Sequence, residues 1–144
     1  MLISDLLRRK GADVITVTPD TSVRDLVALL TDRSIGTAVV SRDGVHVEGI
    51  VSERDIVNSL AARGAAVLSE HLELIMTQQV QTCTLDAKVD DLMRVMTEHR
   101  VRHVPVVVDD ALRGLISIGD IVKSRMDELE LERDALRGYI SSGG

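Results

Sequence analysis

Hydrophobic and polar residues follow one another in short runs along the chain, and each run predicts a strand or a helix. Val14–Val17 is short and rich in β-branched residues, which favours a strand. In Thr21–Asp32, apolar residues recur every three or four positions, as on the buried face of a helix. Thr37–Ser41 and Val45–Val51 flank a polar turn and predict a hairpin. A second helix is expected from Ser52 to about Ala62, so the order is strand, helix, strand, strand, helix.

This series of elements occurs twice in the sequence. Val14–Asp20 aligns with Val80–Asp86, 66 positions later, and after one deleted residue Gly49–Ser52 aligns with Gly114–Ser117. A chance similarity would not keep its register over a whole unit, so the chain contains a duplicated unit. Three strands with helices on one face do not close a core alone. We therefore expect an α/β (α+β) fold in which two β-α-β-β-α repeats pack sheet to sheet with pseudo-two-fold symmetry.

The duplication sets the expected domain limits. Residues 1–68 hold the first repeat, with a short helix at Ile3–Lys10. Residues 69–125 hold the second repeat, with a matching short helix at Glu70–Met76. Residues 126–144 are expected to form a helical tail.

Composition and charge exclude several classes of function. The chain has 44% apolar residues and a net charge of −6, and no segment is strongly basic, so a general electrostatic attraction for nucleic acid is not expected. Phe and Trp are absent and Tyr139 is alone, which removes the stacking surfaces of single-strand binders. The basic triplet Arg8–Lys10 could contact nucleic acid or phosphate, but it also suits the C-terminus of a helix, which we favour.

No constellation of side chains in the sequence points to catalysis or to a metal. Cys83 stands alone, so neither a disulfide framework nor a cysteine-based zinc site is expected. The carboxylates form no recognisable acid/base pair with a nucleophile. No apolar run approaches ~18 residues and the first residues lack the pattern of a signal peptide, so we expect a soluble cytoplasmic protein without membrane contact. The histidines show no metal-ligand spacing: His46, His71, His99 and His103.

A motif of the form Gly-h-h-Ser-x-x-Asp, where h is hydrophobic, ends the hairpin of each repeat, at Gly49–Asp55 and at Gly114–Asp120. Its serine and aspartate match a capping box, in which both side chains only satisfy the first turn of a helix. The same geometry also suits a ligand, because a helix N-terminus favours phosphate and a carboxylate can accept both hydroxyls of a ribose. Two such motifs, facing the cleft where the repeats meet, favour ligand binding.

The two repeats, each ending in this motif, resemble a tandem cystathionine-β-synthase-type (CBS) domain pair, known as the Bateman module. Val101–Val106 resembles that family's hydrophobic-Pro-Val strand, and the chain as a whole resembles the stand-alone bacterial members. The resemblance covers about residues 1–125. It implies that the protein binds an adenosine ligand (AMP, ADP, ATP, NAD or S-adenosylmethionine), as a sensor without turnover and without another cofactor.

The resemblance also implies which residues bind the ligand. Asp55 and Asp120 match the positions that hold the ribose, and Ser52 and Ser117 match hydroxyls near the ribose and the phosphate. The basic residues implied to face phosphate could also be solvated, since Arg102 and its neighbour equally suit an exposed strand edge. The other implied contacts are the first-strand segments beside the adenine, the opposite walls and the basic positions: Ile15, Thr16, Val80 and Thr82; Thr37, Ala38, His103, Val104 and Pro105; Arg54 and Arg102.

The two implied sites are not equivalent. The second repeat has His103-Val104-Pro105 where the first has Thr37-Ala38-Val39, and it has Gly119 where the first has Arg54. We therefore expect unequal affinities for a ligand. Because neither repeat contains an aromatic residue for stacking, the adenine is expected to lie between aliphatic walls such as Ile15, Val17, Val80 and Val104.

The tail carries a heptad-like stripe of mainly apolar residues. Such a stripe could fold back on its own domain, but it lies outside the repeats and an exposed apolar strip needs cover. We therefore expect a symmetric homodimer. The stripe consists of Val122, Met126, Leu129, Arg133, Leu136 and Ile140.

These observations favour a regulatory sensor that binds an adenosine ligand, is not an enzyme, and acts on an unknown protein partner. The alternative is a scaffold that binds no ligand. In that protein the Ser-x-x-Asp motifs would be helix caps only, and function would come from protein contacts.

Overall fold

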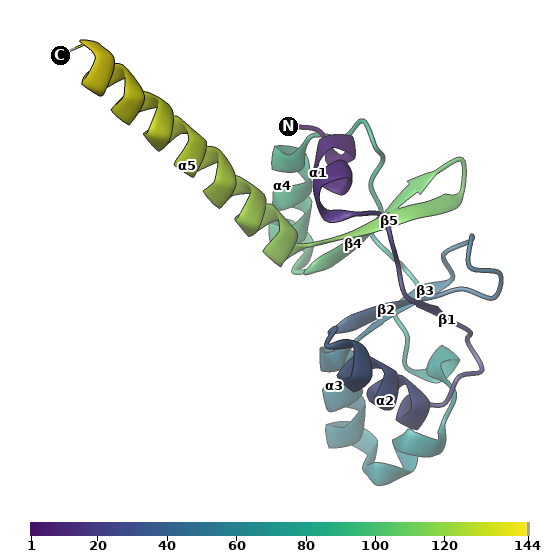
Figure 1. The fold of residues 1–144 in the computed structure, drawn as a ribbon. Coiled ribbons are helices and arrows are strands. Elements are labelled where there is room, and N and C mark those ends of the chain that lie inside the picture. Colours follow the sequence, from purple (N-terminus) through teal and green to yellow (C-terminus); the bar gives the residue numbers. More distant parts are fainter. Residues whose placement is uncertain (144) are drawn as a thin grey trace.

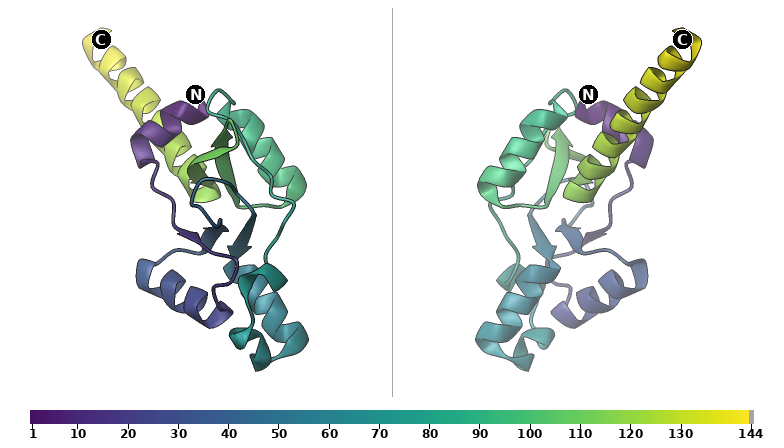
Figure 2. Two further views of the ribbon diagram at one scale, coloured as in Figure 1. Left: turned by 90° about the vertical axis from the view of Figure 1, so that its right-hand side faces the viewer. Right: turned by 90° about the vertical axis from the view of Figure 1, so that its left-hand side faces the viewer.

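The computed structural model describes residues 1–143 and shows two lobes stacked on each other, with the strands in the middle and the helices outside (Figure 1, Figure 2). The predicted α/β fold of two repeats packed sheet to sheet is thus confirmed. The first lobe contains β1 (Thr16–Val17), α2 (Val23–Arg33), β2 (Thr37–Val40), β3 (Gly49–Ser52) and α3 (Glu53–Arg63). The second contains α1 (Ile3–Lys10), α4 (Val89–His99), β4 (His103–Val108), β5 (Ala111–Ser117) and the start of α5 (Ile118–Gly143).

The first sheet has the strand order β1-β2-β3. β1 and β2 are parallel, whereas β2 and β3 are antiparallel, with Thr37 opposite Ser52. This register places the serine of the first motif beside the start of β2. The strand expected over Val14–Val17 is shorter than predicted, since only Thr16 and Val17 belong to β1.

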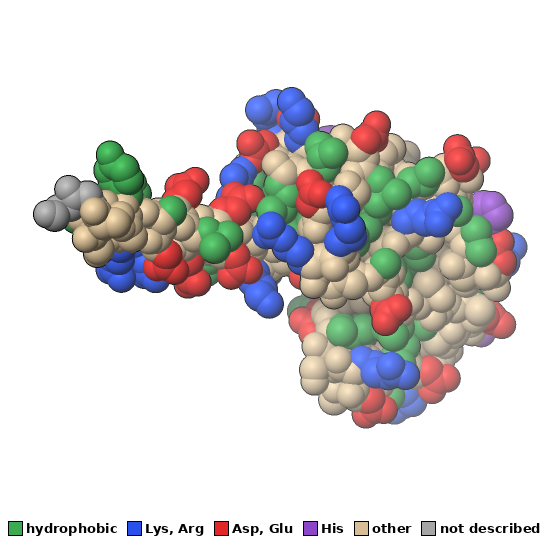
Figure 3. Space-filling model, turned by 45° about the horizontal axis from the view of Figure 1, so that its top comes forward, with side chains coloured by type: hydrophobic (Ala, Val, Ile, Leu, Met, Phe, Trp, Pro, Cys, Tyr) green, Lys and Arg blue, Asp and Glu red, His purple; other side chains and the backbone are tan. Residues whose placement is uncertain are grey.

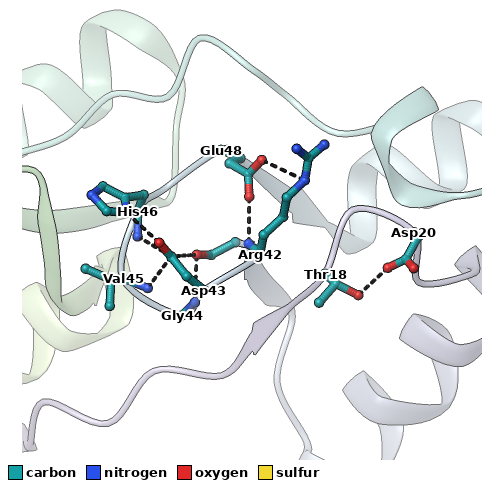
Figure 4. Close-up of polar contacts among 9 residues, drawn as sticks. Thr18, Asp20, Arg42, Asp43, Gly44, Val45, His46 and Glu48 are labelled. Atoms are coloured by element: carbon teal, nitrogen blue, oxygen red, sulfur yellow. Dashed lines mark hydrogen bonds and ion pairs between the residues drawn. The ribbon is translucent and has the colours of Figure 1, made fainter.

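Residues 41–48 form a loop that is held by the carboxylates of Asp43 and Glu48 (Figure 4). Asp43 Oδ1 accepts hydrogen bonds from the backbone N–H groups of Val45 (2.8 Å) and His46 (2.9 Å), and Oδ2 lies 2.6 Å from His46 Nδ1. The hydrogen bond from the His46 N–H is the main cause that holds the pKa of Asp43 well below its usual range. Because the loop satisfies its own backbone donors, the first half of the strand predicted over Val45–Val51 is wrong.

The second sheet contains only β4 and β5, which are joined by a tight turn at Asp109 and Asp110, both at positive φ. The counterpart of the Val14–Val17 strand, predicted at Val80–Cys83, does not form a strand in the described residues. Only an isolated bridge between Cys83 and Val106 remains of it.

The loss of this strand has a cause in the sequence. In the first repeat, the Val39 N–H donates to Ile15 O at 3.2 Å and extends the pairing of β1. The equivalent of Val39 in the second repeat is Pro105, which has no N–H to donate to Gln81. The pairing is therefore reduced to the bonds of Cys83 with its neighbours on β4.

Each lobe contains the segment that precedes the other repeat in the sequence. α1 packs on the second lobe, where the Ile3 N–H donates to Ala87 O at 2.9 Å. Residues 70–76 pack on the first lobe, where the Leu72 N–H donates to Thr21 O, also at 2.9 Å. Thr21 and Ala87 are equivalent positions of the two repeats. The two hydrogen bonds are therefore equivalent as well, and the internal symmetry relates one to the other.

The segments differ in their conformation although they occupy equivalent places. α1 is a regular helix that ends at Gly11, as predicted. The helix predicted over Glu70–Met76 is wrong, because the only helical turn in this region is the short 3-10 turn η2 (Leu72–Leu74), which follows a second 3-10 turn, η1 (Ala65–Ser69).

Each lobe has its own hydrophobic core, completed by the exchanged segment. Ile3, Leu6 and Leu7 of α1 are buried in the second core, and Leu72 is buried in the first. The other buried members of the second core are Val89, Leu92, Met96, Val104, Val106, Ile116 and Ile121; those of the first are Val23, Leu26, Leu30, Ala38, Val40, Val51, Ile56 and Val67.

α5 packs on the second lobe only at its beginning, where Ile121 and Ser124 are buried. Beyond Met126 the helix projects away from the body, with apolar and charged side chains exposed along it (Figure 3). Within residues 1–143, no helix is both long enough and apolar enough to cross a membrane.

Candidate functional site

Both Ser-x-x-Asp motifs have the geometry of a capping box. The Ser52 N–H donates to Asp55 Oδ2 (2.9 Å), and the Asp55 N–H donates to Ser52 Oγ (3.3 Å). Ser117 and Asp120 make the same two hydrogen bonds, at 2.8 and 3.1 Å. In each carboxylate the cap uses only Oδ2, so capping and ligand binding by the other oxygen are compatible.

A cleft of ≈ 1220 Å³ opens beside the first motif, between the two lobes. The first turns of α3 line one side, and the end of α4 with the start of β4 lines the other. Because both repeats contribute, a molecule bound here would contact both lobes at once. Six of the residues implied by the resemblance line this cleft: Thr37, Ser52, Arg54, Asp55, Arg102 and His103.

Thr37 and His103 join the two lobes at this cleft. The Thr37 Oγ1 lies 3.0 Å from His103 Nδ1, and Thr37 is buried. Burial lowers the pKa of His103 below its ordinary value; the charges of Lys10 and Arg102 act in the same direction, against Asp120. The imidazole is therefore neutral at neutral pH, and it presents one donor and one acceptor nitrogen to its surroundings.

Three arginines line the cleft: Arg54, Arg100 and Arg102. None of them forms an ion pair with another residue in 1–143. The acidic side chains of the lining are Glu53 and Asp55, so the cleft carries an excess of positive charge although the chain has a net charge of −6. Such a lining favours an anionic ligand.

Two charged residues of the cleft, Arg100 and Glu53, are not marked as site residues by any pattern in the sequence. Glu53 lies inside the first Gly-h-h-Ser-x-x-Asp motif, at a variable position. Arg100 ends α4 in a left-handed conformation (φ 54), as the equivalent Ser34 ends α2 (φ 53). An arginine with φ above zero is unusual, and this conformation carries the chain from α4 back into the cleft wall. The sequence gives only a weak signal for this conformation, because glycine is the residue that usually indicates a left-handed position at the end of a helix, and arginine is not.

The second motif has a different environment. Lys10, at the end of α1, donates from Nζ to Asp120 Oδ2 at 2.6 Å. Burial opposes ionisation of Asp120, but the hydrogen bonds from Lys10 and Ser117 and the charge of Lys10 outweigh it and lower the pKa of this carboxyl. Neither Ser117 nor Asp120 lines the cleft described above.

The remaining implied ligand residues are not part of the cleft lining. Ala38 and Val104 are completely buried in the two hydrophobic cores, and Pro105 is buried as well, so a ligand could reach only their backbone without a rearrangement. The others lie in β1, just before it, or in the segment that replaces its counterpart: Ile15, Thr16, Val80 and Thr82.

Two other kinds of site, a metal site and a reactive cysteine, have little support in residues 1–143. The structure there contains no group of three or more His, Cys, Asp or Glu residues placed to hold a metal ion. Cys83 is a half-buried free thiol, and burial raises its pKa to about 11, so it is protonated and a poor nucleophile at neutral pH.

The chain belongs to the CBS domain family, since the family model matches residues 3–62 and 70–127. The two matches coincide with the two repeats that the fold shows.

Known proteins resemble the chain over nearly its full length. The CBS domain-containing protein CBSX3, mitochondrial, of Arabidopsis thaliana is 34% identical over 98% of this chain and 72% of its own length. The crystal structure of the CBS-domain containing protein ATU1752 from Agrobacterium tumefaciens superposes with a TM-score of 0.83 at 46% identity, covering 87% of this chain and 99% of that one.

A third neighbour was solved with small molecules. The CBS domain pair of protein MJ0100, in complex with 5′-methylthioadenosine and S-adenosyl-L-methionine, superposes with a TM-score of 0.78 at 25% identity. The match covers 89% of this chain and 98% of that one.

Proposed function

We propose that this CBS pair is a regulatory module that binds an adenosine-containing ligand in the cleft beside Asp55 and has no catalytic activity of its own. The observation that carries the proposal is the cleft itself, in which the capped carboxylate of the first motif faces basic side chains of the second repeat. The solved CBS pair of MJ0100 with two adenosine compounds supports the class of ligand.

The ribose and the phosphate of such a ligand have partners in the cleft. The Oδ1 atom of Asp55 accepts no hydrogen bond from residues 1–143, so it can accept from the hydroxyls of a ribose. The backbone N–H groups at the start of α3 and the guanidinium groups of Arg54, Arg100 and Arg102 favour phosphate. The excess of positive charge favours AMP, ADP, ATP or NAD over the cationic S-adenosylmethionine.

Binding of a ligand would favour one relative arrangement of the two lobes. A ligand that contacts α3 from the first repeat and Arg102 or His103 from the second stabilises the arrangement in which these groups converge. Regulation then follows if a protein partner distinguishes this arrangement from the unliganded one.

Thermal unfolding of the protein with AMP, ADP, ATP, NAD and S-adenosylmethionine tests this function. A ligand at one hundred times its dissociation constant stabilises the fold by about 2.7 kcal/mol and raises the melting temperature. The variant Asp55→Asn keeps an acceptor for the Ser52 N–H but removes the carboxylate, so it should lose the shift. Asp32→Ala, on the exposed face of α2, is the control and should keep it. The absence of a shift with every compound contradicts the proposal.

We also propose that α5 pairs with α5 of a second copy in a symmetric homodimer. The helix exposes its stripe well beyond the body of the protein, with Leu129, Leu136 and Ile140 all more than 60% exposed. A parallel pair would place Arg133 against Arg133 of the second copy in one core layer, so an antiparallel pair is favoured.

The molar mass in solution tests the dimer. Leu136→Glu should convert it to a monomer, whereas Leu131→Glu, on another face of the same helix and equally exposed, should not. A monomer of the unaltered chain at micromolar concentration contradicts the homodimer.

The alternative function is a scaffold in which both Ser-x-x-Asp motifs act only as caps. The capping hydrogen bonds of both motifs favour it. The two functions differ in the ultraviolet spectrum of the purified protein, because a chain with one tyrosine absorbs weakly and a copurifying nucleotide would dominate near 260 nm. A spectrum of protein alone, together with null titrations, supports the scaffold. Hydrolysis of a nucleotide by the purified protein contradicts the absence of catalysis.

A further inference from the structure

Lys10 gives the second motif a partner from elsewhere in the chain. Its Nζ lies 2.6 Å from Asp120 Oδ2 and 2.6 Å from the carbonyl oxygen of Leu115. The same Oδ2 accepts the Ser117 N–H of the helix cap. The side chains of Lys10 and Asp120 are 29% and 23% exposed, so the two charged groups are partly buried where they meet.

The first motif has no counterpart of this lysine. The equivalent backbone contacts of Ile3 and Leu72 align the two exchanged segments, and in this alignment Lys10 corresponds to Gln79. Gln79 is uncharged and exposed, and it lies beyond the 3-10 turn that replaces the helix. Within the described chain Asp55 forms no ion pair, and it faces the cleft.

We propose that Lys10 occupies the second motif as an internal substitute for a ligand, so that each chain binds one adenosine ligand, at Asp55. This inference rests on the proposed function. An ammonium group and a ribose both act as donors to the same carboxylate, and the charge-assisted bond of the ammonium is the stronger of the two. Lys10 bonds to the same oxygen, Oδ2, as the helix cap, so a ribose that reached Oδ1 of Asp120 would compete with the ammonium group for the charge of this carboxylate and for the space beside it.

Lys10 is the last residue of α1, and the position of this helix is fixed by its packing. Ile3, Leu6 and Leu7 bury α1 in the core of the second lobe, which brings its last residue to the start of α5. Lys10 is followed by Gly11 (φ 96), where the chain leaves the helix toward β1. The contact therefore depends on the exchange of segments between the lobes.

Counting bound ATP tests the inference. Equilibrium dialysis with labelled ATP should give one ATP per chain for the unaltered protein and for the control Lys123→Met, which removes an exposed lysine of α5. Lys10→Met keeps the length of the side chain without its charge and should give two. Adding Asp120→Asn to Lys10→Met should return the number to one, and adding Asp55→Asn to Lys10→Met should leave only the site at Asp120.

The contact itself can be measured without a ligand. Acylation by an amine-reactive reagent, followed residue by residue with mass spectrometry, should be slower at Lys10 than at Lys123. Asp120→Asn should bring the two rates together. Equal rates in the unaltered protein would show that Lys10 does not occupy the motif, and would overturn the inference.

The outcomes separate the inference from the proposed function. Two ATP per unaltered chain, or one ATP on both the unaltered chain and Lys10→Met, overturns the inference alone. If ATP binds to neither protein, and the other adenosine compounds of the panel fail as well, the proposed function and the inference fall together.

Discussion

Thr37 and His103 stand at the same position of the two repeats, and their side chains meet, with Thr37 Oγ1 3.0 Å from His103 Nδ1. Equivalent atoms of two symmetric halves approach each other only near the axis that relates the halves. The pseudo-two-fold axis of the molecule therefore passes close to this pair. The sequence breaks the symmetry at the axis itself, since a hydroxyl faces an imidazole there.

Thr37→Val should destabilise the protein by about 1–3 kcal/mol, because it removes one partner of a buried hydrogen bond and leaves the ring nitrogen of His103 unpaired. Urea unfolding measures the change. Thr31→Val is the control, since the Thr31 hydroxyl donates to Val27 O on the exposed face of α2. An equal effect of both substitutions would show that the contact between the lobes adds nothing.

The stability of the protein should depend on the protonation of His103. Its pKa in the folded protein is lowered, above all by burial, and the charges nearby are those of Lys10, Arg102, Asp120 and Glu53. The unfolded chain therefore binds the proton more readily, so the contribution of His103 is complete above the ordinary histidine pKa of about 6.5 and is lost as the pH falls below it.

His103→Gln provides the comparison for this pH dependence, because glutamine keeps a hydrogen-bonding side chain that does not titrate. The free energy of unfolding of the unaltered protein should fall more steeply than that of the variant between about pH 6.5 and the lower pKa of the folded state. Parallel curves from neutral to mildly acidic pH would contradict a neutral, half-buried imidazole.

Gly114→Ala should destabilise the protein by about 1–3 kcal/mol through a clash with α1. A Cβ at this position would lie 2.7 Å from Leu7 Cδ2, and Leu7 is buried. Gly138→Ala is the control, because a Cβ there meets nothing within 4 Å, and it should stabilise α5 by about 0.5–1 kcal/mol. If Leu7 causes the clash, Leu7→Ala and Gly114→Ala should together cost less than the sum of their separate effects in urea.

Pro105→Val should lengthen the second sheet. The new N–H would face Gln81 O, as the Val39 N–H faces Ile15 O in the first repeat. Hydrogen exchange should then show a protected amide at residue 105 and slower exchange in the neighbouring segment around Cys83. Rapid exchange at residue 105 would show that something other than the missing donor shortens this sheet.

The repeats and their helix caps could be predicted from the sequence, because both depend on local patterns. The helical spacing before Arg33 and the capping geometry at Ser52 and Ser117 are properties of a few neighbouring residues. The strand predicted at Val80–Cys83 is wrong because it follows from the alignment with Val14–Val17, whereas the missing donor lies on the strand opposite, at Pro105.

The packing partners of the short segments could not be predicted. The sequence places α1 before the first repeat, and nothing in its pattern of Ile3, Leu6 and Leu7 tells which of the two cores it enters. The partner of Lys10 follows from that choice, since Asp120 lies 110 residues away. The three arginines of the cleft meet for the same reason, because two of them reach it only through the packing of the second lobe.

The exchange of α1 and residues 70–76 between the lobes has a consequence for the origin of the protein. A single ancestral unit, with its leading segment in front of its first strand, could not cover its own core with that segment if it had this geometry. It could do so only by trading the segment with an identical neighbour. Within this single chain the second repeat is that neighbour, so neither half can close its core without the other.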